Sequence, residues 1–241
     1  MVVLSCFSLS SGGKYFWLSS SLSPIITKIL TLSSIFISLL TWFEIVSPYA
    51  LYLNYTLIFK NFQIWRIFTN FFYFGNFSLG LIFHMIMFFR NSKLLEKKVF
   101  KGSAPDYLYF ILFCMLFLLI FNPFTKIIFL SQSLSFAMTY YWGRKSKTTN
   151  VEFMGVFHFR APYLPWFYLV VSFLLESDFK NDLYGLLIGH IYFYLKEILP
   201  RIKSVNNIKI LETPKFFEKL CDKLNINNEF IIDVEDGDLL F

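Results

Sequence analysis

Long apolar stretches recur along most of this chain of 241 residues, and short polar or charged segments separate them. A run of about 20 apolar residues crosses the hydrocarbon core of a bilayer as a helix, in which the backbone polar groups pair within the segment. The pattern predicts an all-α membrane protein with six transmembrane helices. Four lie at approximately residues 24–46, 77–89, 107–121 and 126–142, the fifth extends to about residue 175, and the sixth lies at approximately 183–199.

Three of these stretches, the second, third and sixth, are short. They offer roughly 13–17 apolar residues, below the ~20 that a helix needs to cross a core of ~30 Å without adjustment. A short helix thins the bilayer locally or draws its polar flanks inward. The alternative is that the true helices extend beyond these apolar limits.

Basic residues are distributed unevenly between the two sides that six such helices define. One side carries the clusters 90–101 and 144–147 together with Lys14 and Lys28, whereas the other carries only Lys60, Arg66, Lys126 and Lys180. Because short cytosolic loops are enriched in Lys and Arg, we expect both termini to be cytosolic. The chain then divides into an N-terminal arm at 1–23, a membrane domain at 24–200 and a cytosolic tail at 201–241.

Composition supports the membrane class. Hydrophobic residues make up 56% of the chain and charged residues only 16%, against about 25% in ordinary soluble domains. The net charge of +6 is explained by the basic loops, so we interpret it as a sign of orientation and not of nucleic-acid binding. The three cysteines lie far apart and show no metal-type or redox-type spacing, so we expect no cofactor or metal.

The connector between the first two stretches contains an unusual aromatic run, QIWRIFTNFFYFG at residues 63–75. Aromatic rings favour the membrane–water boundary, and an Arg among them sends its charge either to headgroups or to a polar protein interior. We expect a structured element at the lumenal interface. The alternative is an ordinary aromatic belt beside an Arg that reaches out to the headgroups.

Polar side chains inside the predicted helices are the first candidates for function, because they are expensive to place in lipid. These candidates are His84, His190 and the group Ser131, Gln132, Ser133 and Ser135. Gly185 and Gly189 are four residues apart, so they share one helix face and allow a neighbouring backbone to approach closely. For His190 the alternative is a core histidine with a satisfied hydrogen bond.

A serine in one helix and a histidine in another are also the dyad of an intramembrane serine protease, in which the histidine takes the serine proton. A nucleophilic serine there needs a glycine-containing turn around it, and the stretch SQSLSFAMTYYWG has no glycine near its serines. Membrane serines more often form hydrogen bonds with neighbouring helices. The sequence therefore predicts that the protein is not an enzyme.

An ordered series of short motifs covers residues 24–200. In chain order they are Pro24 with Thr27-Lys28, Ser47-Pro48, Gln63-Ile64-Trp65-Arg66 with Thr69-Asn70-Phe71 and Phe74-Gly75, Leu95-Glu96 with Phe100, Gly102, Ala104 and Asp106, Met138-Thr139-Tyr140 with Trp142 and Arg144, Phe153-Met154-Gly155, Ala161 to Trp166, and Asp182-Leu183 with Gly185 and Gly189 to Phe193. In these motifs the chain resembles the Derlin family, the rhomboid-like pseudoproteases of endoplasmic-reticulum-associated degradation.

The resemblance implies a rhomboid-like fold whose six helices help to move misfolded proteins from the lumen to the cytosol. Derlins are thought to thin the membrane and to offer a hydrophilic half-channel with a lateral opening. They work beside a membrane ubiquitin ligase and a cytosolic AAA ATPase. The residues that the resemblance assigns to the family motifs and the translocation path are Gln63, Trp65, Arg66, Thr69, Asn70, Gly75, His84, Gln132, Gly185, Gly189 and His190.

Within that set, the resemblance implies that Trp65 and Arg66 shape the lumenal mouth and that Gly185 and Gly189 hold the sixth helix close. His84 and His190 would add polarity inside. The physical case is that each unsatisfied backbone group of a translocating chain costs several kcal/mol in lipid, so a shorter and wetter path lowers the barrier.

The tail departs from the family pattern. Many Derlins end in a Gly-rich, Arg-containing box that docks the ATPase, whereas this chain ends in DVEDGDLLF, so direct docking of the ATPase does not follow from the resemblance. We expect a multi-pass protein of the endoplasmic reticulum membrane. The alternative, suggested by the Ser-rich start, the AT-rich codon usage and the missing box, is a relative used for protein import across an outer membrane of a complex plastid. Homo- and hetero-oligomers both stay open.

Overall fold

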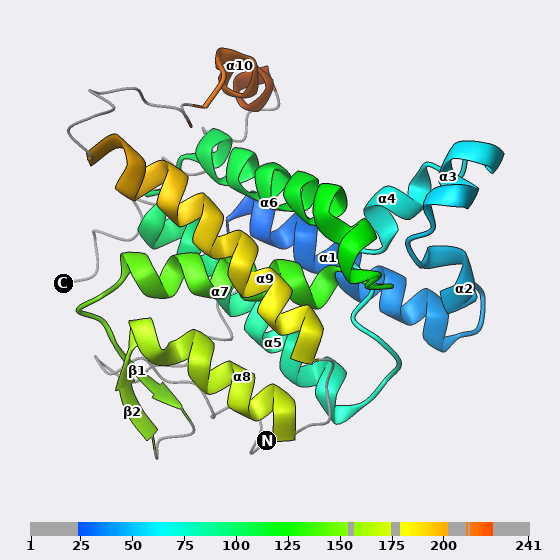
Figure 1. Ribbon diagram of the computed structural model, residues 1–241, viewed down its shortest axis with the longest axis horizontal. Helices are drawn as coiled ribbons and strands as arrows, with labels where there is room; N and C mark the ends of the chain where they lie inside the picture. Colours follow the sequence, from blue (N-terminus) through cyan, green and yellow to red (C-terminus); the bar gives the residue numbers. More distant parts are fainter. Residues whose placement is uncertain (1–23, 154–156, 175–178, 202–210, 212, 224–241) are drawn as a thin grey trace.

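The computed structural model describes residues 24–153, 157–174, 179–201, 211 and 213–223. The predicted N-terminal arm at 1–23 and most of the predicted tail lie outside the described residues. The described part is mostly helical, and six of its helices have more than ten residues, one for each predicted stretch. They are α1 (Ile25–Trp42), α5 (Leu79–Leu94), α6 (Ala104–Thr125), α7 (Ser131–Lys145), α8 (Leu164–Leu174) and α9 (Phe179–Phe193) (Figure 1).

The connector between α1 and α5 folds into three short helices at one end of the molecule (Figure 1). They are α2 (Pro48–Leu51), α3 (Tyr55–Asn61) and α4 (Trp65–Thr69). Ser47 and Asn54 precede α2 and α3, and their side chains accept hydrogen bonds from backbone N–H groups in the first turns, as N-cap residues do. The expectation of a structured element in this region is confirmed.

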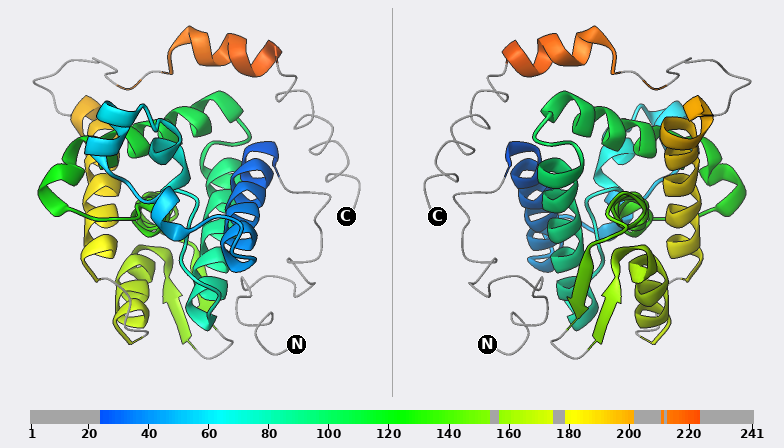
Figure 2. Two further views of the ribbon diagram at one scale, coloured as in Figure 1. Left: turned by 90° about the vertical axis from the view of Figure 1, so that its right-hand side faces the viewer. Right: turned by 90° about the vertical axis from the view of Figure 1, so that its left-hand side faces the viewer.

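Helix α7 lies at the centre of the fold. Figure 2 shows it end-on, with α5, α8 and α9 around it and α1 on the far side of α5. Most of its residues from Ser131 to Gly143 are buried. A Cβ built on Gly185 would lie 2.0 Å from the carbonyl oxygen of Ser133, and one on Gly189 would lie 2.7 Å from that of Ala137. The predicted close approach at these two glycines of α9 is therefore confirmed, and α7 is the backbone that they admit.

Several helices continue past the limits of their apolar stretches. Helix α5 runs into a π-helix at Leu95–Val99, and α9 runs into a π-helix at Tyr194–Ile198 followed by a 3₁₀ turn at Leu199–Arg201. Helix α6 has 22 residues and contains Asn122 and Pro123, which lie between the predicted stretches 107–121 and 126–142. The prediction that the second, third and sixth helices are short is thus wrong, and the alternative of longer helices is correct.

The continuation of α6 through Pro123 has a tertiary cause. Proline lacks the N–H that would bond to the carbonyl of Leu119, four residues earlier. The hydroxyl of Tyr55, in α3, donates to that carbonyl oxygen at 2.6 Å. The helix then ends at Lys126, which has a φ of 55°, and the Asn122 side chain pairs with both the N–H and the carbonyl of Ile127.

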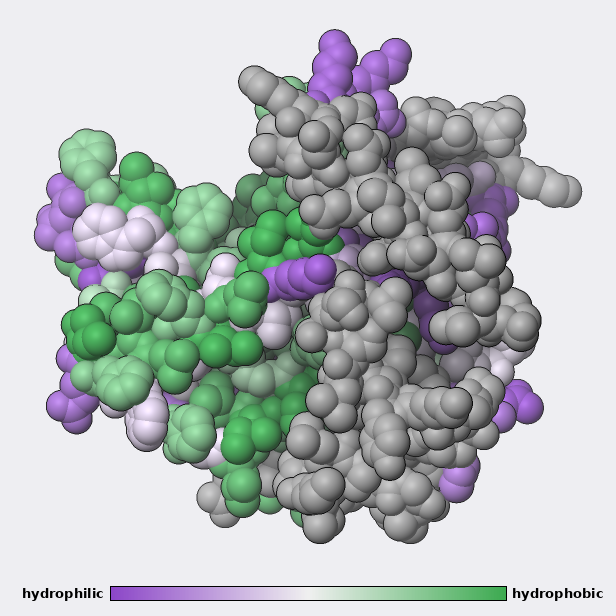
Figure 3. All heavy atoms as spheres, turned by 180° about the vertical axis from the view of Figure 1, so that it is seen from behind, coloured by the Kyte–Doolittle hydropathy of each residue, from purple (hydrophilic) through white to green (hydrophobic). Residues whose placement is uncertain are grey.

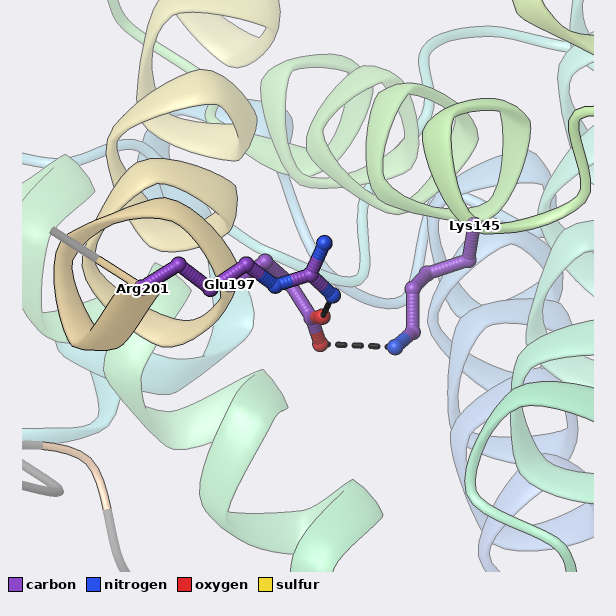
Figure 4. A network of polar contacts seen from close by, with 3 residues as sticks. All are labelled: Lys145, Glu197 and Arg201. Atoms are coloured by element: carbon purple, nitrogen blue, oxygen red, sulfur yellow. Dashed lines mark hydrogen bonds and ion pairs between the residues drawn. The ribbon is translucent and has the colours of Figure 1, made fainter. Parts of the chain in front are cut away.

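A two-stranded antiparallel hairpin, β1 (Asn150–Phe153) and β2 (Phe157–Arg160), joins α7 to α8 and was not predicted. A 3₁₀ turn at Ala161–Tyr163 connects it to α8. At the same end, Lys145 Nζ lies 2.7 Å from Glu197 Oε1, and Arg201 Nη2 lies 3.4 Å from Glu197 Oε2 (Figure 4). The Lys145–Glu197 pair links the end of α7 to the continuation of α9, whereas the Arg201–Glu197 pair lies within that continuation. Partly exposed ion pairs of this kind contribute little stability.

The outer surface is rich in large apolar side chains. Along α1 alone, six are exposed: Ile29, Leu32, Ile35, Phe36, Leu39 and Trp42. Figure 3 shows a hydrophobic surface over the side of the molecule where α1 to α4 lie. By length and composition, α1 and α6 are each able to cross a membrane, and the segment Ala161–Leu174 is a shorter apolar helix.

Candidate functional site

Arg66, in α4, binds the end of α2 and the turn between α3 and α4. Its side chain is 6% exposed. Nε donates to Gln63 Oε1 at 2.6 Å, and Nη1 donates to the carbonyl oxygens of Tyr49 and Tyr52 at 2.9 and 3.0 Å. The guanidinium also lies 5.0 Å from the centre of the Tyr52 ring. The sequence predicted that the charge of Arg66 would reach either the headgroups or a polar protein interior. The structure places it in the polar protein interior.

Trp65 and Thr69 are the ends of α4 and have different surroundings. Trp65 is 52% exposed, so its ring faces outward. The Thr69 hydroxyl lies within hydrogen-bond distance of two carbonyl oxygens, that of Leu51 at 3.2 Å and that of Trp65 at 3.0 Å. Thr69 therefore holds α4 against the end of α2, while the Trp65 ring is exposed at the surface.

Asn70 and Gly75 connect this element to the helices of the bundle. Asn70 is fully buried, its Nδ2 donates to the carbonyl of Arg66 at 2.6 Å, and its own carbonyl accepts from the N–H of Leu130 at 3.3 Å, next to the start of α7. Gly75 has a φ of 112°, a conformation that residues with a Cβ rarely adopt. Both residues position the connector and neither presents a reactive group.

A buried polar cluster joins α7, α8 and α9 near their shared end. Gln132 Nε2 donates to Asp182 Oδ1 at 2.7 Å and lies 3.3 Å from Ser172 Oγ. Asp182 is fully buried and Ser172 is 1% exposed. The hydroxyl of Ser133 donates to the carbonyl of Asn181 at 2.8 Å. We call Gln132, Ser172 and Asp182 the α7–α9 polar cluster.

Asp182 was not among the predicted site residues, although it stands in one of the family motifs, Asp182-Leu183. A signal was present in its spacing: residues 182, 185 and 189 share one face of a helix, and the two glycines already mark that face as the packed one. A carboxylate on this face must lie against the neighbouring helix, where Gln132 supplies a donor. The spacing of Asp182 relative to the two glycines therefore distinguishes it from an acidic residue in a solvent-exposed loop.

The interface between α5 and its neighbours is also polar. His84 is 6% exposed. Arg90 is 3% exposed, its Nη1 donates to the Tyr168 hydroxyl of α8 at 3.0 Å, and its guanidinium lies 5.8 Å from the centre of the Trp142 ring of α7. Asn91 donates to the Thr139 hydroxyl of α7. In the described residues, α5 and α8 approach each other at few positions, so the Arg90–Tyr168 bond is a main link between them.

A second buried network, not predicted as a site, joins α1, α5 and α6 at their basic end. Glu96 is 2% exposed and accepts hydrogen bonds from the Thr27 N–H at 2.9 Å and the Thr27 hydroxyl at 2.7 Å. Ser92 Oγ lies 2.9 Å from Thr27 Oγ1 and 2.6 Å from the Tyr107 hydroxyl. Because the Thr27 proton is committed to Glu96, Ser92 donates to Thr27 and Tyr107 donates to Ser92. Burial raises the pKa of Glu96, and the hydrogen bonds from Thr27 act in the opposite direction.

His190 does not lie inside the bundle, which differs from the expectation. It is exposed on the outer side of α9, and its Nδ1 lies 2.6 Å from the Tyr140 hydroxyl. Both residues line a groove of about 850 Å³ with apolar residues of α6, α8 and α9. The hydroxyls of Ser131 and Ser133 donate to the carbonyls of Tyr73 and Asn181, so these two serines and His190 each have other partners than one another.

The geometry defines a class of protein: a helical bundle with an apolar exterior, polar clusters between its helices and a structured aromatic connector at one end. The profile of the Der1-like family matches residues 23–215. The probable derlin-2 homolog of Dictyostelium discoideum is 37% identical over 206 residues, which cover 83% of this chain and 80% of that protein.

Two plant relatives show the same similarity. Derlin-2.2 of Arabidopsis thaliana is 39% identical over 208 residues, covering 82% of this chain and 84% of that protein. Derlin-1.2 of Zea mays is 31% identical over 220 residues, covering 90% and 88%. The chain belongs to the Der1-like family, and it is thus a derlin homologue, a multi-pass membrane protein related to endoplasmic-reticulum-associated degradation.

Proposed function

We propose that this protein assists the retrotranslocation of misfolded polypeptides from the lumen or membrane of the endoplasmic reticulum to the cytosol. It does so as a rhomboid-like bundle of six transmembrane helices with both termini in the cytosol, through local membrane thinning and a hydrophilic half-channel. Family membership supports the role, and the buried α7–α9 polar cluster is the observation that carries the mechanism.

The length of α7 supports local thinning. Helix α7 has 15 residues, and described residues flank it at both ends. At 1.5 Å per residue it extends about 22 Å, less than the ~30 Å of a typical hydrocarbon core. The α7–α9 polar cluster lies at the first turns of α7 and α9, on the predicted lumenal side. Polar groups at that depth lower the cost of bringing a polypeptide backbone into the membrane.

The weak packing between α5 and α8 supports a lateral opening at this interface. Arg90 and Tyr168 link the two helices near the predicted cytosolic end, and Phe83 contacts the Tyr168 ring edge-on with the ring centres 6.2 Å apart. A client segment entering from the lipid would meet His84 and Asn91 behind this interface. Trp65, exposed on α4, would contact the client at the lumenal mouth.

We also propose that the protein breaks no covalent bond. Ser131 and Ser133 donate to backbone carbonyls and His190 pairs with Tyr140, an arrangement that gives neither serine a base. Work on the client would come from partners: a membrane ubiquitin ligase and a cytosolic AAA ATPase. The final residues of the tail, where an ATPase-docking box would stand, lie outside the described residues.

The proposal is tested by client turnover in cells depleted of this protein. A misfolded lumenal client should persist after depletion, and the wild-type chain should restore its degradation. The double substitution Gln132→Leu with Asp182→Leu replaces the half-buried Gln132 and the buried Asp182 together by apolar groups, and the removal of both partners of such a pair is often neutral for stability. At equal expression, it should restore degradation poorly.

A matched control is Lys145→Ala, which removes a partly exposed ion pair on the same helix as Gln132 and should restore degradation fully. Normal client turnover after depletion would contradict the proposed function. Full restoration by the double variant would contradict only the role of the polar cluster, and not the proposed function. A tagged copy that coincides with a marker of the endoplasmic reticulum supports the proposed location, whereas one that coincides with a plastid marker contradicts it.

A further inference from the structure

The segment that follows the membrane domain returns to the bundle as an amphipathic helix, α10 (Lys215–Lys223). Phe217 contacts the Tyr109 ring of α6 with the ring centres 5.8 Å apart, and Cys221 is fully buried. Just before α10, the Thr213 hydroxyl donates to Asp106 Oδ1 at the start of α6. Helix α10 is therefore docked on the first turns of α6, and nearly all of it lies beyond the region that the family profile matches.

Helix α10 lies crosswise to the central helix. In Figure 1 it is seen nearly end-on above α6 while α7 runs across the view, and in Figure 2 α7 is end-on while α10 runs across. If α7 crosses the membrane, α10 is oriented along the membrane plane. This is the orientation of interfacial amphipathic helices.

The depth of α10 follows from the outer face of α6. Leu112, Leu116 and Ile120 are four residues apart and exposed, so they form an apolar face that turns to lipid. From Asp106 to Thr125, α6 extends about 28 Å, close to the ~30 Å of the hydrocarbon core. The contacts of α10 with Asp106 and Tyr109 place it at one end of that face, at the level of the headgroups.

The residues that α10 turns outward have the chemistry of a headgroup contact. Phe216 is 68% exposed, and Lys215 and Lys219 on either side of it are also exposed. Glu218 is exposed as well, so among the side chains of α10 that the structure describes, two exposed lysines stand against one exposed carboxylate. Lysine places its ammonium among phosphates while its stem covers apolar surface, and an exposed aromatic ring is favoured at the acyl boundary.

We propose that α10 is an interfacial helix that binds the anionic phospholipids of the cytosolic leaflet. Phe216 inserts at the boundary between headgroups and acyl chains, Lys215 and Lys219 contact phosphates, and Phe217 and Cys221 hold the helix on α6. This contact fixes the start of the tail at the membrane surface beside α6. The proposal goes beyond the proposed retrotranslocation role and does not depend on it, since it needs only a membrane-embedded chain.

The test uses the full-length protein in lipid nanodiscs with the photoreactive phenylalanine analogue p-benzoylphenylalanine at position 216 or, as the matched control, at the adjacent position 217. Irradiation should yield a lipid adduct from position 216 and an internal cross-link to the α6 peptide around Tyr109 from position 217. Absence of a lipid adduct from position 216, or a lipid adduct from position 217, would overturn the proposal.

The charge requirement is measured separately. Nanodiscs containing phosphatidylserine should give more lipid adduct at position 216 than nanodiscs of phosphatidylcholine alone. Because each lysine near an anionic surface contributes about fivefold in affinity, Lys215→Glu with Lys219→Glu should remove most of that difference. Lys147→Glu, on another loop of the same predicted side, should leave it unchanged. Equal adduct yields in the two lipids would overturn the role of anionic headgroups.

Discussion

Glu96 closes the N-terminus of a helix that begins some 70 residues earlier in the chain. Its Oε2 accepts the N–H of Thr27 at 2.9 Å, and its Oε1 lies 3.4 Å from the N–H of Ile26. The residue before α1 is Pro24, whose side chain offers no acceptor for these N–H groups. A carboxylate is favoured at a helix N-terminus by the helix dipole as well. A tertiary contact thus does here what an N-cap side chain does locally.

Substituting Glu96 by Ala should destabilise the protein strongly. The variant leaves the N–H and hydroxyl of Thr27 buried without their acceptor, at a cost of about 1–3 kcal/mol for each unsatisfied group. Thermal unfolding of the purified protein in detergent measures the effect, and Lys98→Ala, at an exposed position two residues further along, serves as the control. Equal unfolding temperatures for the two variants would contradict the capping role.

Glu96 should also give the stability a pH dependence. Since burial raises its pKa in the folded protein, the folded state holds the Glu96 proton to higher pH than the unfolded state does. Its contribution to the free energy of unfolding is therefore full below the unfolded-state pKa and is lost as pH rises through the raised folded-state pKa. The free energy of unfolding, measured across this pH range, should fall with rising pH in the wild type. This pH dependence should be absent in Glu96→Gln. A slope that persists in the variant would assign it to another group.

Arg66 should not be replaceable by lysine. The guanidinium bonds to Gln63, Tyr49 and Tyr52 from two nitrogens, and a single ammonium cannot reproduce this fork. We expect Arg66→Lys to lose about 1–3 kcal/mol locally, and the backbone amides of 48–69 to exchange with deuterium faster. Lys60→Ala, at an exposed position of α3, should leave exchange unchanged. Unaltered exchange in Arg66→Lys would show that the connector is held by other contacts.

Gly185 should tolerate no side chain. An added Cβ would lie 2.0 Å from the Ser133 carbonyl oxygen, so α9 must move away from α7. Overpacking of this kind costs about 1–3 kcal/mol or more. By contrast, Gly80→Ala meets only the Ser78 hydroxyl at 3.5 Å and should be nearly neutral. A thermal shift assay compares the two variants, and equal stability of both would mean that α9 repacks freely.

Much of the helical architecture could be predicted from the sequence, because apolar length and charge asymmetry are local properties. The six long helices, the structured connector and the packing role of Gly185 and Gly189 followed from such patterns. The boundaries did not. Asn122 and Pro123 form a common turn signal, yet α6 continues through them because the Tyr55 hydroxyl satisfies the carbonyl that proline frees.

The candidate site was predictable in part for the same reason. Arg66 and Gln132 stood out as polar residues in apolar surroundings, and the structure gives both of them hydrogen-bond partners in the protein. Asp182 and Glu96 looked like loop acids, since only their contacts with Gln132 and Thr27 distinguish them from solvated carboxylates. His190 looked like an interior histidine, because a sequence does not show which side of a packed helix faces the neighbouring helices.

The sequence by itself determined the class of this protein, since long apolar stretches have few stable solutions other than membrane helices, and its ordered motifs determined the family. Tertiary structure alone decided where the polar groups lie and what they hold. Hydrogen bonds between residues tens of positions apart, such as Gln132 with Asp182 and Arg90 with Tyr168, depend on how the helices rotate against one another. That rotation is set by packing around α7, which α5, α6, α8 and α9 all contact.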